Sequence, residues 1–398
     1  MSREWKSVAL KDILTRIQSG YWGEEHPTKE RSNVVRVIRN ADVTRDGRRK
    51  SFAVRALSDL EREKSALSVG DISLATSGEV GKAWLVDEDG YHVTNFLKRL
   101  TVNPSIADPG FVRHLFDWEP LKRDMAAHTG GSAIQNLRRS FFESARVMLP
   151  PLAEQRRIVD LVGSIDRCID SLQTQVEATR VARSALLAEL LSNAGDDWKF
   201  ARLGDVSKLH IGRTPPRSEA KYWSTNLERP FCTIADMTGR YCRPVREGVT
   251  ELAENEGKAK RILAGTLLMS FKLTIGRVAF ADCDLFPNEA IVSILPDHGA
   301  VTAEFLYYFL GSRDLTRESG QAVKGKTLNG ASLRSIEVLI PPLSEQREIV
   351  DLMDAVERQI ESVTSHRDAA LKFRTAVLSE LLSGERLLDE SYDVAVSL

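Results

Sequence analysis

A long segment of this chain occurs twice, 191 positions apart, and this repeat constrains the fold more than any other feature. The first copy starts at Pro150 with PPLAEQRRIVDLVGSIDRCIDSLQ, and the second starts at Pro341 with PPLSEQREIVDLMDAVERQIESVT. Over residues 150–192 and 341–383, 21 of 43 positions are identical without a gap. Repeats on this scale mark a structural unit that recurs along the chain.

The segments before each copy also resemble each other, although more weakly. Three pairs show this: WKSVALKDI at Trp5 with WKFARLGDV at Trp198, GDISLATSGEVGKAWL at Gly70 with GTLLMSFKLTIGRVAF at Gly265, and Ala41-Asp42 with Ala235-Asp236. The chain of 398 residues, 42% of them hydrophobic, is long enough for two domains with sizeable cores. We therefore predict two copies of one unit, each a globular part of about 145 residues followed by a polar segment of about 45 residues.

The repeated polar segments have the apolar spacing of coiled-coil helices. Apolar residues recur at steps of four and three, which is the spacing of a helix seam. A double proline precedes each segment, and proline favours the first turn of a helix. The seam residues are Ile158, Val162, Ile165, Ile169, Leu172 and Val176 in the first helix and Ile349, Met353, Val356, Ile360 and Val363 in the second.

The connection between the helices predicts that they pair antiparallel. The first helix ends near Ser192, and the second globular part, Trp198 to Ile340, leads directly into the second helix. A domain of this size is about 30 to 40 Å across, whereas a helix of about 40 residues is about 60 Å long. Parallel pairing would force the domain to span that length. We therefore expect an antiparallel pair with a globular part at each end, related by a pseudo-twofold axis.

Arginines interrupt the apolar seam in both predicted helices. Arg183 and Arg374 occupy equivalent seam positions, and Arg367 adds a third arginine in the second helix. Each arginine could extend its charged group out of the seam to solvent. Alternatively, a polar group inside the seam could fix the register of the two helices. The sequence leaves both interpretations open.

Composition places the chain in the class of ordinary soluble proteins. No apolar run reaches the roughly 18 to 20 residues that span a bilayer, and the start MSREWKSVALKD lacks the apolar stretch of a signal peptide. We therefore expect a cytoplasmic protein without membrane contact. The four cysteines, Cys168, Cys232, Cys242 and Cys283, form no CxxC pair. Reduced thiols are expected, with no metal and no cofactor.

Positive charge is concentrated in the globular parts, although the whole chain carries −1. The net charge is +4 for residues 1–149 and +2 for residues 196–340, against −1 for residues 150–195 and −6 for residues 341–398. Single basic clusters are usually solvated surface. Two globular parts that each carry several such clusters favour binding to the phosphate backbone of double-stranded DNA.

The duplicated (L/I)PPL-x-EQR-x-IVD helices, each preceded by a W-K-x-x-x-L-x-D opening, resemble the specificity subunit of type I restriction-modification enzymes. G-x-x-A and G-x-A segments at Gly276–Ala279 and Gly81–Ala83 add to the likeness. The resemblance implies an α+β fold with two similar mixed target recognition domains, residues 1–149 and 196–340. It implies spacer helices at residues 150–195 and 341–386, with residues 387–398 as a tail.

The resemblance also implies a function and partners. Each domain of such a subunit recognises one half of a bipartite DNA target, and the helices set the spacing and dock two methyltransferase subunits. Endonuclease and translocase subunits complete the full complex. The chain itself is expected to be non-catalytic, since it contains no [DN]PP[YF] tetrapeptide, H-E-x-x-H or G-x-S-x-G motif.

Candidate site residues follow from charge, from hydrogen-bonding capacity and from the family motif. For contact with DNA we predict Arg48, Arg49, Lys50, Ser77, Lys98, Gln135, Arg138 and Arg139 in the first domain, and Lys272, Thr274, Arg277, Lys324 and Lys326 in the second. For docking of partner subunits, the family motif indicates Glu154, Gln155, Arg156, Glu345, Gln346 and Arg347. An equally good interpretation of these six residues is capping and packing at the helix start.

Residues 320–327, GQAVKGKT, fit the phosphate-loop template G-x-x-x-x-G-K-[ST]. A true phosphate loop follows a buried strand and begins a helix. Here EFLYYFLGSRDL precedes with helical spacing, and Asn329-Gly330 follows as a turn signal before a short strand. DNA phosphate contact by Lys324 and Lys326 is the better interpretation. A nucleotide-dependent enzyme and a coiled-coil adaptor that binds protein stay as the alternatives.

Overall fold

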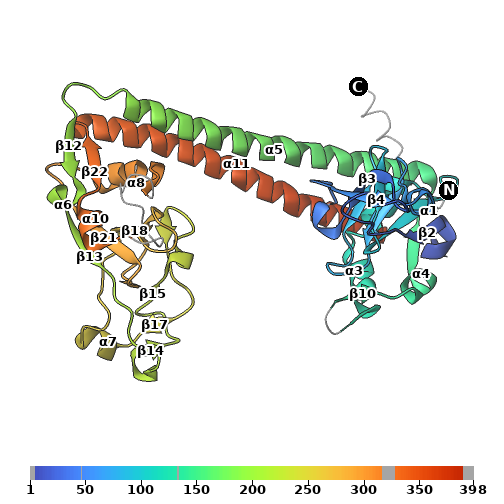
Figure 1. Cartoon of the computed structure of the whole chain (residues 1–398), viewed down its shortest axis with the longest axis horizontal. Coiled ribbons are helices and arrows are strands. Elements are labelled where there is room, and N and C mark those ends of the chain that lie inside the picture. Colours follow the sequence, from blue (N-terminus) through green and yellow to red (C-terminus); the bar gives the residue numbers. More distant parts are fainter. Residues whose placement is uncertain (1–4, 46, 132–133, 316–327, 389–398) are drawn as a thin grey trace. The chain divides into compact units, whose positions relative to one another are not determined.

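The computed structural model describes residues 5–45, 47–131, 134–315 and 328–388, and these residues form two compact units. The first unit contains residues 1–173 and 365–398, and the second contains residues 174–364. The boundary between the units falls inside both long helices, α5 (Leu152–Ser192) and α11 (Leu343–Ser383). Each unit therefore combines one globular part with one half of each long helix (Figure 1).

Four strands of the main sheet have the same order in both units, and the second unit adds a fifth strand at the edge. In the first unit the order is β2 (Leu14–Ser19), β8 (Leu97–Val102), β5 (Ile72–Ala75) and β6 (Ala83–Leu85). In the second it is β13 (Ser207–Ile211), β21 (Ile291–Pro296), β18 (Leu267–Ser270), β19 (Val278–Ala281) and β16 (Tyr241–Cys242). Neighbouring strands are antiparallel, except that β16 runs parallel to β19.

The repeat extends to the pairing of smaller strands. A parallel pair joins β3 (Asn33–Ile38) to β7 (Tyr91–Val93) in the first unit and β15 (Phe231–Cys232) to β20 (Phe286–Pro287) in the second. Val37 lies opposite His92, and Phe231 lies opposite Phe286, so both partners are shifted by the same 194 positions. Matched register in segments with little sequence identity shows that the weak echoes before the helices reflect one common fold.

A two-stranded antiparallel pair closes each globular part just before its long helix. In the first unit β1 (Lys6–Ala9) pairs with β11 (Arg146–Leu149), and in the second β12 (Lys199–Arg202) pairs with β22 (Glu337–Ile340). The first and last strands of each globular part therefore lie side by side. This pair brings the start of each globular part back to the point where the proline pair begins the long helix.

Short helices supply part of the aromatic core of each unit. Phe111 on α2 and Phe141 on α4 are fully buried in the first unit, as are Phe305 and Tyr308 on α8 in the second. Each such side chain contributes about 1.5 to 3 kcal/mol of burial free energy. The helices are α1 (Asp59–Ser65), α2 (Pro109–Leu115), α3 (Glu119–Ala127), α4 (Ser140–Ser144), α6 (Leu203–Val206), α7 (Glu251–Asn255), α8 (Ala303–Ser312) and α10 (Gly330–Arg334).

The remaining elements are short, apart from β4, which pairs antiparallel with β3. They are the 3-10 turns η1 (Leu10–Ile13), η2 (Asn40–Asp42), η3 (Ala220–Tyr222) and η4 (Ile234–Asp236), and the strands β4 (Ala53–Leu57), β9 (Thr129–Gly130), β10 (Asn136–Leu137), β14 (Trp223–Ser224) and β17 (Gly248–Val249). The Ala-Asp echo of the sequence lies on η2 and η4. Asp42 and Asp236 each accept a hydrogen bond from the backbone N–H that begins the turn, at 2.9 and 2.8 Å. The echo therefore has a structural role in closing these turns.

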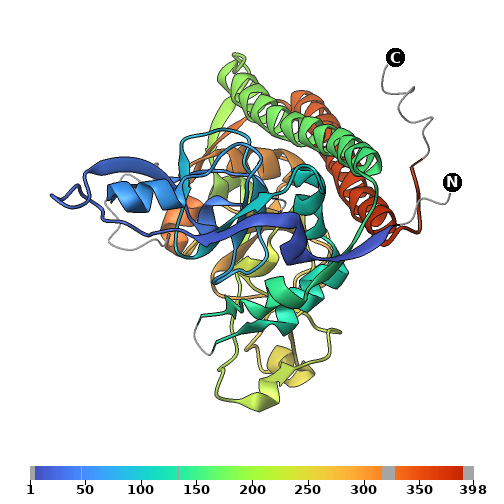
Figure 2. The same cartoon turned by 90° about the vertical axis from the view of Figure 1, so that its right-hand side faces the viewer.

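Within each unit, half of α5 packs antiparallel against half of α11, as the sequence predicts (Figure 1 and Figure 2). In the first unit Ile158 and Val162 share a core with Leu378 and Leu381 of the opposite end of α11. In the second unit Leu187, near the end of α5, shares a core with residues at the start of α11. The predicted seam residues Ile158, Val162, Ile169, Val176, Ile349, Met353, Ile360 and Val363 are buried.

The seam arginines pair across the two helices. Arg183 contacts Glu357 at 2.6 Å, and Arg367 donates to the Gln173 side chain at 2.9 Å. Arg374 forms hydrogen bonds to both carboxylate oxygens of Asp166 and is only 12% exposed. These directed contacts favour the interpretation that the arginines fix register over simple extension into solvent, because a shift of one residue would separate the charges.

A glutamine at the start of each long helix ties that helix to the globular part. The Gln155 side chain accepts from the backbone N–H of Asp108 at 2.8 Å and donates to the carbonyl of Pro150 at 2.8 Å. Gln346 repeats this with the N–H of Thr302 at 2.9 Å and the carbonyls of Pro341 and Ala300 at 2.9 and 3.0 Å. Asp108 and Thr302 are the N-cap residues of α2 and α8. One buried amide thus joins two helix starts in each unit.

Gln346→Ala should destabilise the second unit by about 1 to 3 kcal/mol, because it leaves a buried N–H and two carbonyls without their partner. The neighbouring Arg347 is exposed, so Arg347→Ala should change the free energy of unfolding by less than about 0.5 kcal/mol. Urea unfolding of the full chain measures both values. Equal stabilities for the two variants would contradict this role of the glutamine.

An ion pair with a hydrogen-bonded tyrosine joins the globular part of the second unit to α11. Arg240 donates to Asp354 at 2.6 Å, and the Tyr308 hydroxyl donates to the same carboxylate at 2.5 Å. Burial alone would raise the pKa of Asp354, but the hydrogen bonds from Arg240 and Tyr308 outweigh it, and the pKa lies below its ordinary value. A depressed carboxylate pKa means that the folded state is stabilised by the charged form.

Asp354→Asn should lower the free energy of unfolding at pH 7 by about 2 kcal/mol, the usual size of a charge-assisted hydrogen bond. The contribution is complete above the unfolded-state pKa of about 3.9 and is lost as pH falls through the lower folded-state pKa. The difference between the two chains should therefore shrink below about pH 4. Denaturant unfolding at several pH values tests this, and a difference that is independent of pH would contradict it.

Candidate nucleic-acid interface

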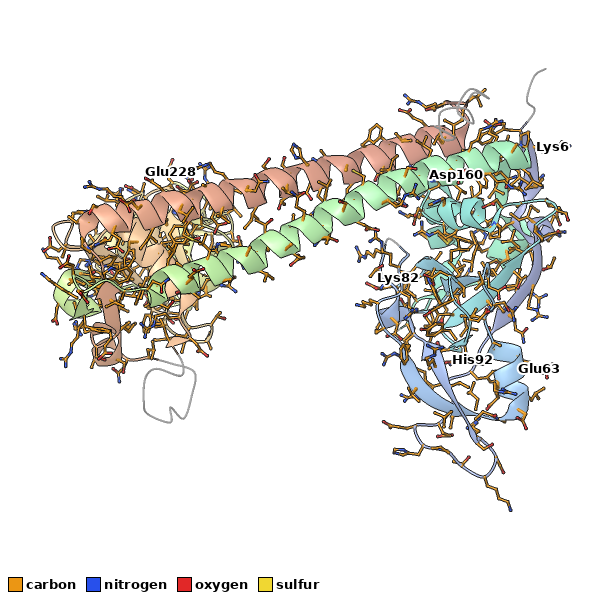
Figure 3. The ribbon with its side chains drawn as sticks, turned by 90° about the horizontal axis from the view of Figure 1, so that it is seen from above. Lys6, Glu63, Lys82, His92, Asp160 and Glu228 are labelled. Atoms are coloured by element: carbon orange, nitrogen blue, oxygen red, sulfur yellow. The ribbon has the colours of Figure 1, made fainter. Side chains whose placement is uncertain are left out.

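Two turns with the same backbone lie at equivalent places in the two main sheets. The first turn, residues 76–82, joins β5 to β6, and the second turn, residues 271–277, joins β18 to β19. In the first, the Ala75 N–H donates to the Lys82 carbonyl at 2.8 Å and the Gly81 N–H to the Ala75 carbonyl at 2.9 Å. In the second, Ser270 and Gly276 make the corresponding bonds, also at 2.8 and 2.9 Å. Figure 3 labels Lys82, which ends the first turn.

The two positions with positive φ also match between the turns. Gly81 and Gly276 have φ values of 96° and 84°, and Gly78 and Leu273 have φ values of 77° and 62°. The side chains between the matched bonds are different: Ser-Gly-Glu-Val at residues 77–80 and Lys-Leu-Thr-Ile at residues 272–275. A fixed backbone with exchanged side chains presents different chemical groups in the same geometry, as expected of surfaces that bind different targets.

Predicted DNA-contact residues of the first unit gather beside the first turn. The Gly78 N–H donates to the Gln135 carbonyl at 2.9 Å, and Ser77 bridges to Asn136, so the segment 134–139 lies along the turn. Gln135, Arg138 and Arg139 are exposed there. The structure thus brings together Ser77, Lys98, Gln135, Arg138 and Arg139, although they come from three separate segments.

Lys98 occupies an electrostatically unfavourable position near these residues. Its ammonium group donates to the Ser19 hydroxyl at 2.9 Å. Burial and the positive charge of Arg139 lower the pKa of Lys98 below its ordinary value. Arg139 contacts Glu143 at 3.2 Å, but its side chain is 92% exposed, and among the described residues no negative charge lowers the cost for Lys98. A bound anion would relieve both effects, because it would place a negative charge beside the Lys98 ammonium group. Lys98 with Arg139 is therefore suited to a phosphate group.

The other three predicted basic residues of the first unit lie elsewhere. Arg48 forms an ion pair with Asp170 on α5. Arg49 contacts Glu88 at 2.6 Å and stacks over the Tyr91 ring, 4.4 Å from its centroid. Lys50 is exposed. Arg48 and Arg49 thus join parts of the first unit to each other, and the sequence could not show this because their acidic partners are distant along the chain.

In the second unit the predicted residues Lys272, Thr274 and Arg277 all lie on the second turn. Thr274 and Arg277 are exposed, and Arg277 donates to the Ile234 carbonyl at 3.2 Å. Lys324, Lys326 and the whole phosphate-loop template, residues 320–327, lie outside the described residues. Helix α8 precedes the template, as its apolar spacing predicts, and its apolar face is buried.

The Asn329-Gly330 signal begins a short helix, so the expectation of a turn without a helix is wrong at this point. Asn329 is the N-cap of α10, and its side-chain oxygen accepts the Ser332 N–H at 2.8 Å. Asparagine is among the best N-cap residues, and this preference outweighs its use in turns. The strand expected after it is present as β22.

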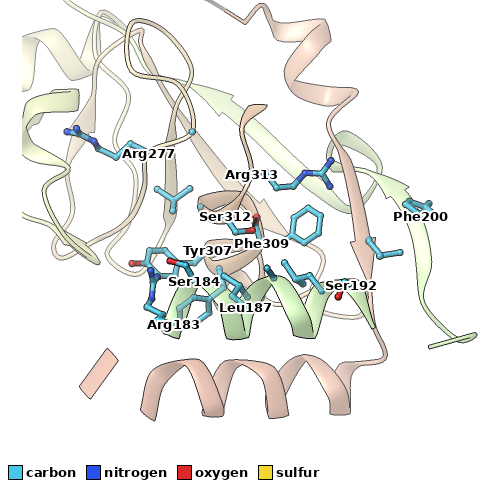
Figure 4. A pocket seen from close by; sticks show the side chains of 17 residues that line it. Arg183, Ser184, Leu187, Ser192, Phe200, Arg277, Tyr307, Phe309, Ser312 and Arg313 are labelled. Atoms are coloured by element: carbon cyan, nitrogen blue, oxygen red, sulfur yellow. Dashed lines mark hydrogen bonds between the residues drawn. The ribbon is translucent and has the colours of Figure 1, made fainter. Parts of the chain in front are cut away.

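A groove of about 740 Å³ continues from the second turn onto α5 (Figure 4). Its walls include Arg277 of the turn, Arg183 of α5, and Tyr307 and Arg313 around α8. Exposed Phe200 on β12 also lines it. Sequence reasoning missed Arg313, Tyr307 and Phe200 as surface residues of one groove, because they come together only through the packing of α8 against α5.

The six residues predicted to dock partner subunits divide into two classes. Glu154, Gln155 and Gln346 are buried, and Glu345 accepts a hydrogen bond from the Trp198 indole N–H at 2.9 Å. Arg156 and Arg347 are exposed. The glutamic acids and glutamines thus face the interior of their units, in keeping with the capping and packing interpretation, and the two arginines face outward.

Two classes of site are not found in the described part of the chain. Among these residues, no group of three or more histidine, cysteine, aspartate or glutamate side chains is placed to hold a metal ion. Within the same residues, no helix is long and apolar enough to cross a membrane.

A family model for the type I restriction modification DNA specificity domain matches the chain twice, at residues 2–179 and 195–372. The MjaX chain of Methanocaldococcus jannaschii, assigned as a type I restriction enzyme specificity subunit, is 22% identical over 96% of this chain and 93% of its own length. The EcoR124I/EcoR124II specificity subunit of Escherichia coli is 22% identical over 56% of each chain.

Solved structures share the fold. A chain from a study of complex assembly and conformational transition in the type I R-M system has a TM-score of 0.65, with 21% identity over 95% of this chain and 97% of its own. The S subunit of a type I restriction-modification system from M. genitalium has a TM-score of 0.55, with 14% identity over 96% of both chains. At these identities the likeness establishes the fold.

Lys98→Ala and Arg139→Ala should each weaken binding to any DNA duplex and reduce the slope of log affinity against log salt by about 0.9, the value for one lost phosphate contact. Arg49→Ala is the matched control and should leave the slope unchanged, because the Arg49 side chain is only 21% exposed and stacks over the Tyr91 ring, whereas that of Arg139 is 92% exposed. Fluorescence anisotropy across a salt series measures the slopes. An effect of Arg49→Ala as large as that of Lys98→Ala would contradict this assignment.

Proposed function

The chain belongs to the family of type I restriction-modification DNA specificity proteins, and on this basis we propose that it selects the DNA sequence on which a methyltransferase and endonuclease complex acts. One observation carries the proposal: the two turns have the same backbone hydrogen bonds and positive φ at the same two positions, but different side chains. A protein that recognises two different half-sites in the same manner requires such a pair, because phosphate contacts set the position and base contacts set the sequence.

Each globular part recognises one half of a bipartite target. Residues 1–149 form the first recognition domain and residues 196–340 form the second. In the first domain Lys98, Arg138 and Arg139 contact phosphates, while Ser77 and Gln135 face base edges, because hydroxyl and amide groups suit the donors and acceptors of the major groove. In the second domain Lys272, Thr274 and Arg277 serve the same purposes. Lys324 and Lys326 are assigned to phosphate contact in the second domain on the basis of their positive charge alone.

The long helices hold the spacing of the two half-sites and dock two methyltransferase subunits. The segments are residues 150–195 and 341–386. Arg156 and Arg347 support this role, because they are exposed at equivalent places while the neighbouring Gln155 and Gln346 are buried within their units. Equivalent exposed arginines offer the same contact twice, which suits two copies of one partner. Endonuclease and translocase subunits join the assembled complex.

The chain contributes recognition and no chemistry of its own. Methyl transfer and cleavage belong to the partner subunits, and the complex acts on DNA in the cytoplasm. Gln155, Gln346 and Glu345 support this division, because their hydrogen bonds hold the start of each long helix to the fold. A nucleotide site at residues 320–327 and a purely protein-binding adaptor have no specific observation in their favour.

A domain replacement tests the proposal. The registers Lys6↔Leu149 and Lys199↔Ile340 are equivalent, so residues 6–149 can replace residues 199–340 at matching strand ends. With methyltransferase subunits supplied, the wild-type chain should direct adenine methylation to a bipartite motif with two different halves. The replaced chain should methylate a motif that contains the first half on both sides.

Sequencing of methylated adenines in host DNA provides the measurement. In the control chain, the equivalent residues of a relative replace residues 6–149. This exchange should change only the half of the motif that the first domain recognises. A change in both halves from a single replacement would show that the two domains do not recognise the DNA separately. Methylation without any sequence preference would argue against a recognition function.

A further inference from the structure

Leu273 in the second turn combines two features that are unfavourable in the free protein. Its φ of 62° lies in the left-handed region, and no other non-glycine residue among those described has a positive φ. Its side chain is also 76% exposed. An L-residue in this region suffers a clash between its Cβ and the backbone that glycine avoids. The equivalent residue of the first turn is Gly78, which adopts a φ of 77°.

The surrounding hydrogen bonds prevent the turn from relaxing this strain. The Ser270 N–H and the Gly276 N–H close the turn through the Arg277 and Ser270 carbonyls. The Ser270 hydroxyl accepts the Arg277 N–H at 3.0 Å and contacts the Thr274 carbonyl. The conformation of Leu273 is thus imposed by its neighbours. Glycine would fit this backbone better, so the leucine side chain has a use that the stability of the free unit does not explain.

The neighbours of Leu273 indicate what the side chain contacts. Lys272 and Thr274 flank it, and Arg277 ends the same turn at the edge of the groove (Figure 4). An exposed apolar group on a turn that also carries two cations, Lys272 and Arg277, is poorly suited to an apolar protein surface. It is well suited to DNA, where phosphates surround the bases. The prominent apolar feature in the major groove is the C5-methyl group of thymine.

We propose that Leu273 recognises a thymine in the half-site of the second domain, through contact of its side chain with the C5-methyl group in the major groove. This inference rests on the proposed function, because it assumes that the second turn faces bases. The first turn offers Ser77, Gly78 and Glu79 and lacks an apolar side chain at the equivalent position. Dependence on a thymine methyl group through this position is therefore confined to one half of the target.

The test uses the full chain assembled with its methyltransferase subunits. It measures binding to duplexes that contain the bipartite motif identified by methylation sequencing. Each thymine of the second half-site, on either strand, is replaced singly by deoxyuridine, which removes only the methyl group. One replacement should weaken wild-type binding by about four-fold, the loss that corresponds to one buried methyl-sized group. Leu273→Gly should weaken binding to the thymine duplex at least as much, and it should not distinguish thymine from deoxyuridine at that position.

Leu263→Gly is the matched control, because Leu263 is also in the second unit, is 65% exposed, and has an ordinary backbone conformation. It should retain both the affinity and the sensitivity to deoxyuridine. The unfolding temperature gives an independent measurement. Leu273→Gly relieves the strain and should unfold at the same temperature as the wild type or higher, whereas a leucine that packs within the protein would make the variant less stable.

Four outcomes would overturn the inference. Wild-type binding that is insensitive to deoxyuridine at every thymine of the second half-site would exclude a methyl contact. Leu273→Gly that loses stability along with affinity would assign the side chain to packing. A wild-type complex that neither binds nor methylates any specific sequence would contradict the proposed function itself. A sequence-specific wild type together with an equally active Leu273→Gly variant would contradict only the inference about Leu273.

Discussion

The geometry of each unit depends on the buried amide at the start of its long helix. Gln155 and Gln346 bond to backbone groups that belong to two different helix starts, so the long helix cannot rotate against the globular part without losing hydrogen bonds. In the second unit, Arg240, Tyr308 and Asp354 add a second fixed point at the next turns of α11. A recognition surface is useful only when its direction is fixed, and these contacts fix it relative to the adjoining helix half.

The two turns illustrate how a fold can be retained while its specificity changes. Backbone hydrogen bonds and two positions with positive φ determine the shape of the turn, and only one of these positions is strictly glycine in both copies. Val80 and Ile275 pack against the cores of their units, but the other side chains between these positions lie outside the core. They are therefore free to diverge, and the identity of the target can change without loss of stability. The buried strands that carry the turns, β5 and β18, are under the opposite constraint, because every residue in them is buried.

Much of this architecture could be predicted from sequence, because the features that determine it are periodic or repeated. The seam residues predicted the two helices, and the short link after Ser192 predicted their antiparallel pairing, which is confirmed within each unit. The roles of Arg48, Arg49, Gln155 and Gln346 were not predictable, because each depends on a partner that is distant along the chain. Leu273 was overlooked for another reason: nothing in a leucine indicates a left-handed backbone. Alignment with Gly78 of the first copy would have drawn attention to it.

The first unit is assembled from both ends of the chain, whereas the second is built from one continuous stretch. During synthesis, the second unit has all its residues once Thr364 leaves the ribosome. The first unit must wait for the last part of α11, and until then the apolar stripe at Ile158 and Val162 lacks Leu378 and Leu381. A nascent chain that stops before α11 is finished therefore exposes an apolar surface at Ile158 and Val162 in the first unit. Synthesis of the last part of α11 is the event that covers this surface and protects the new chain from aggregation.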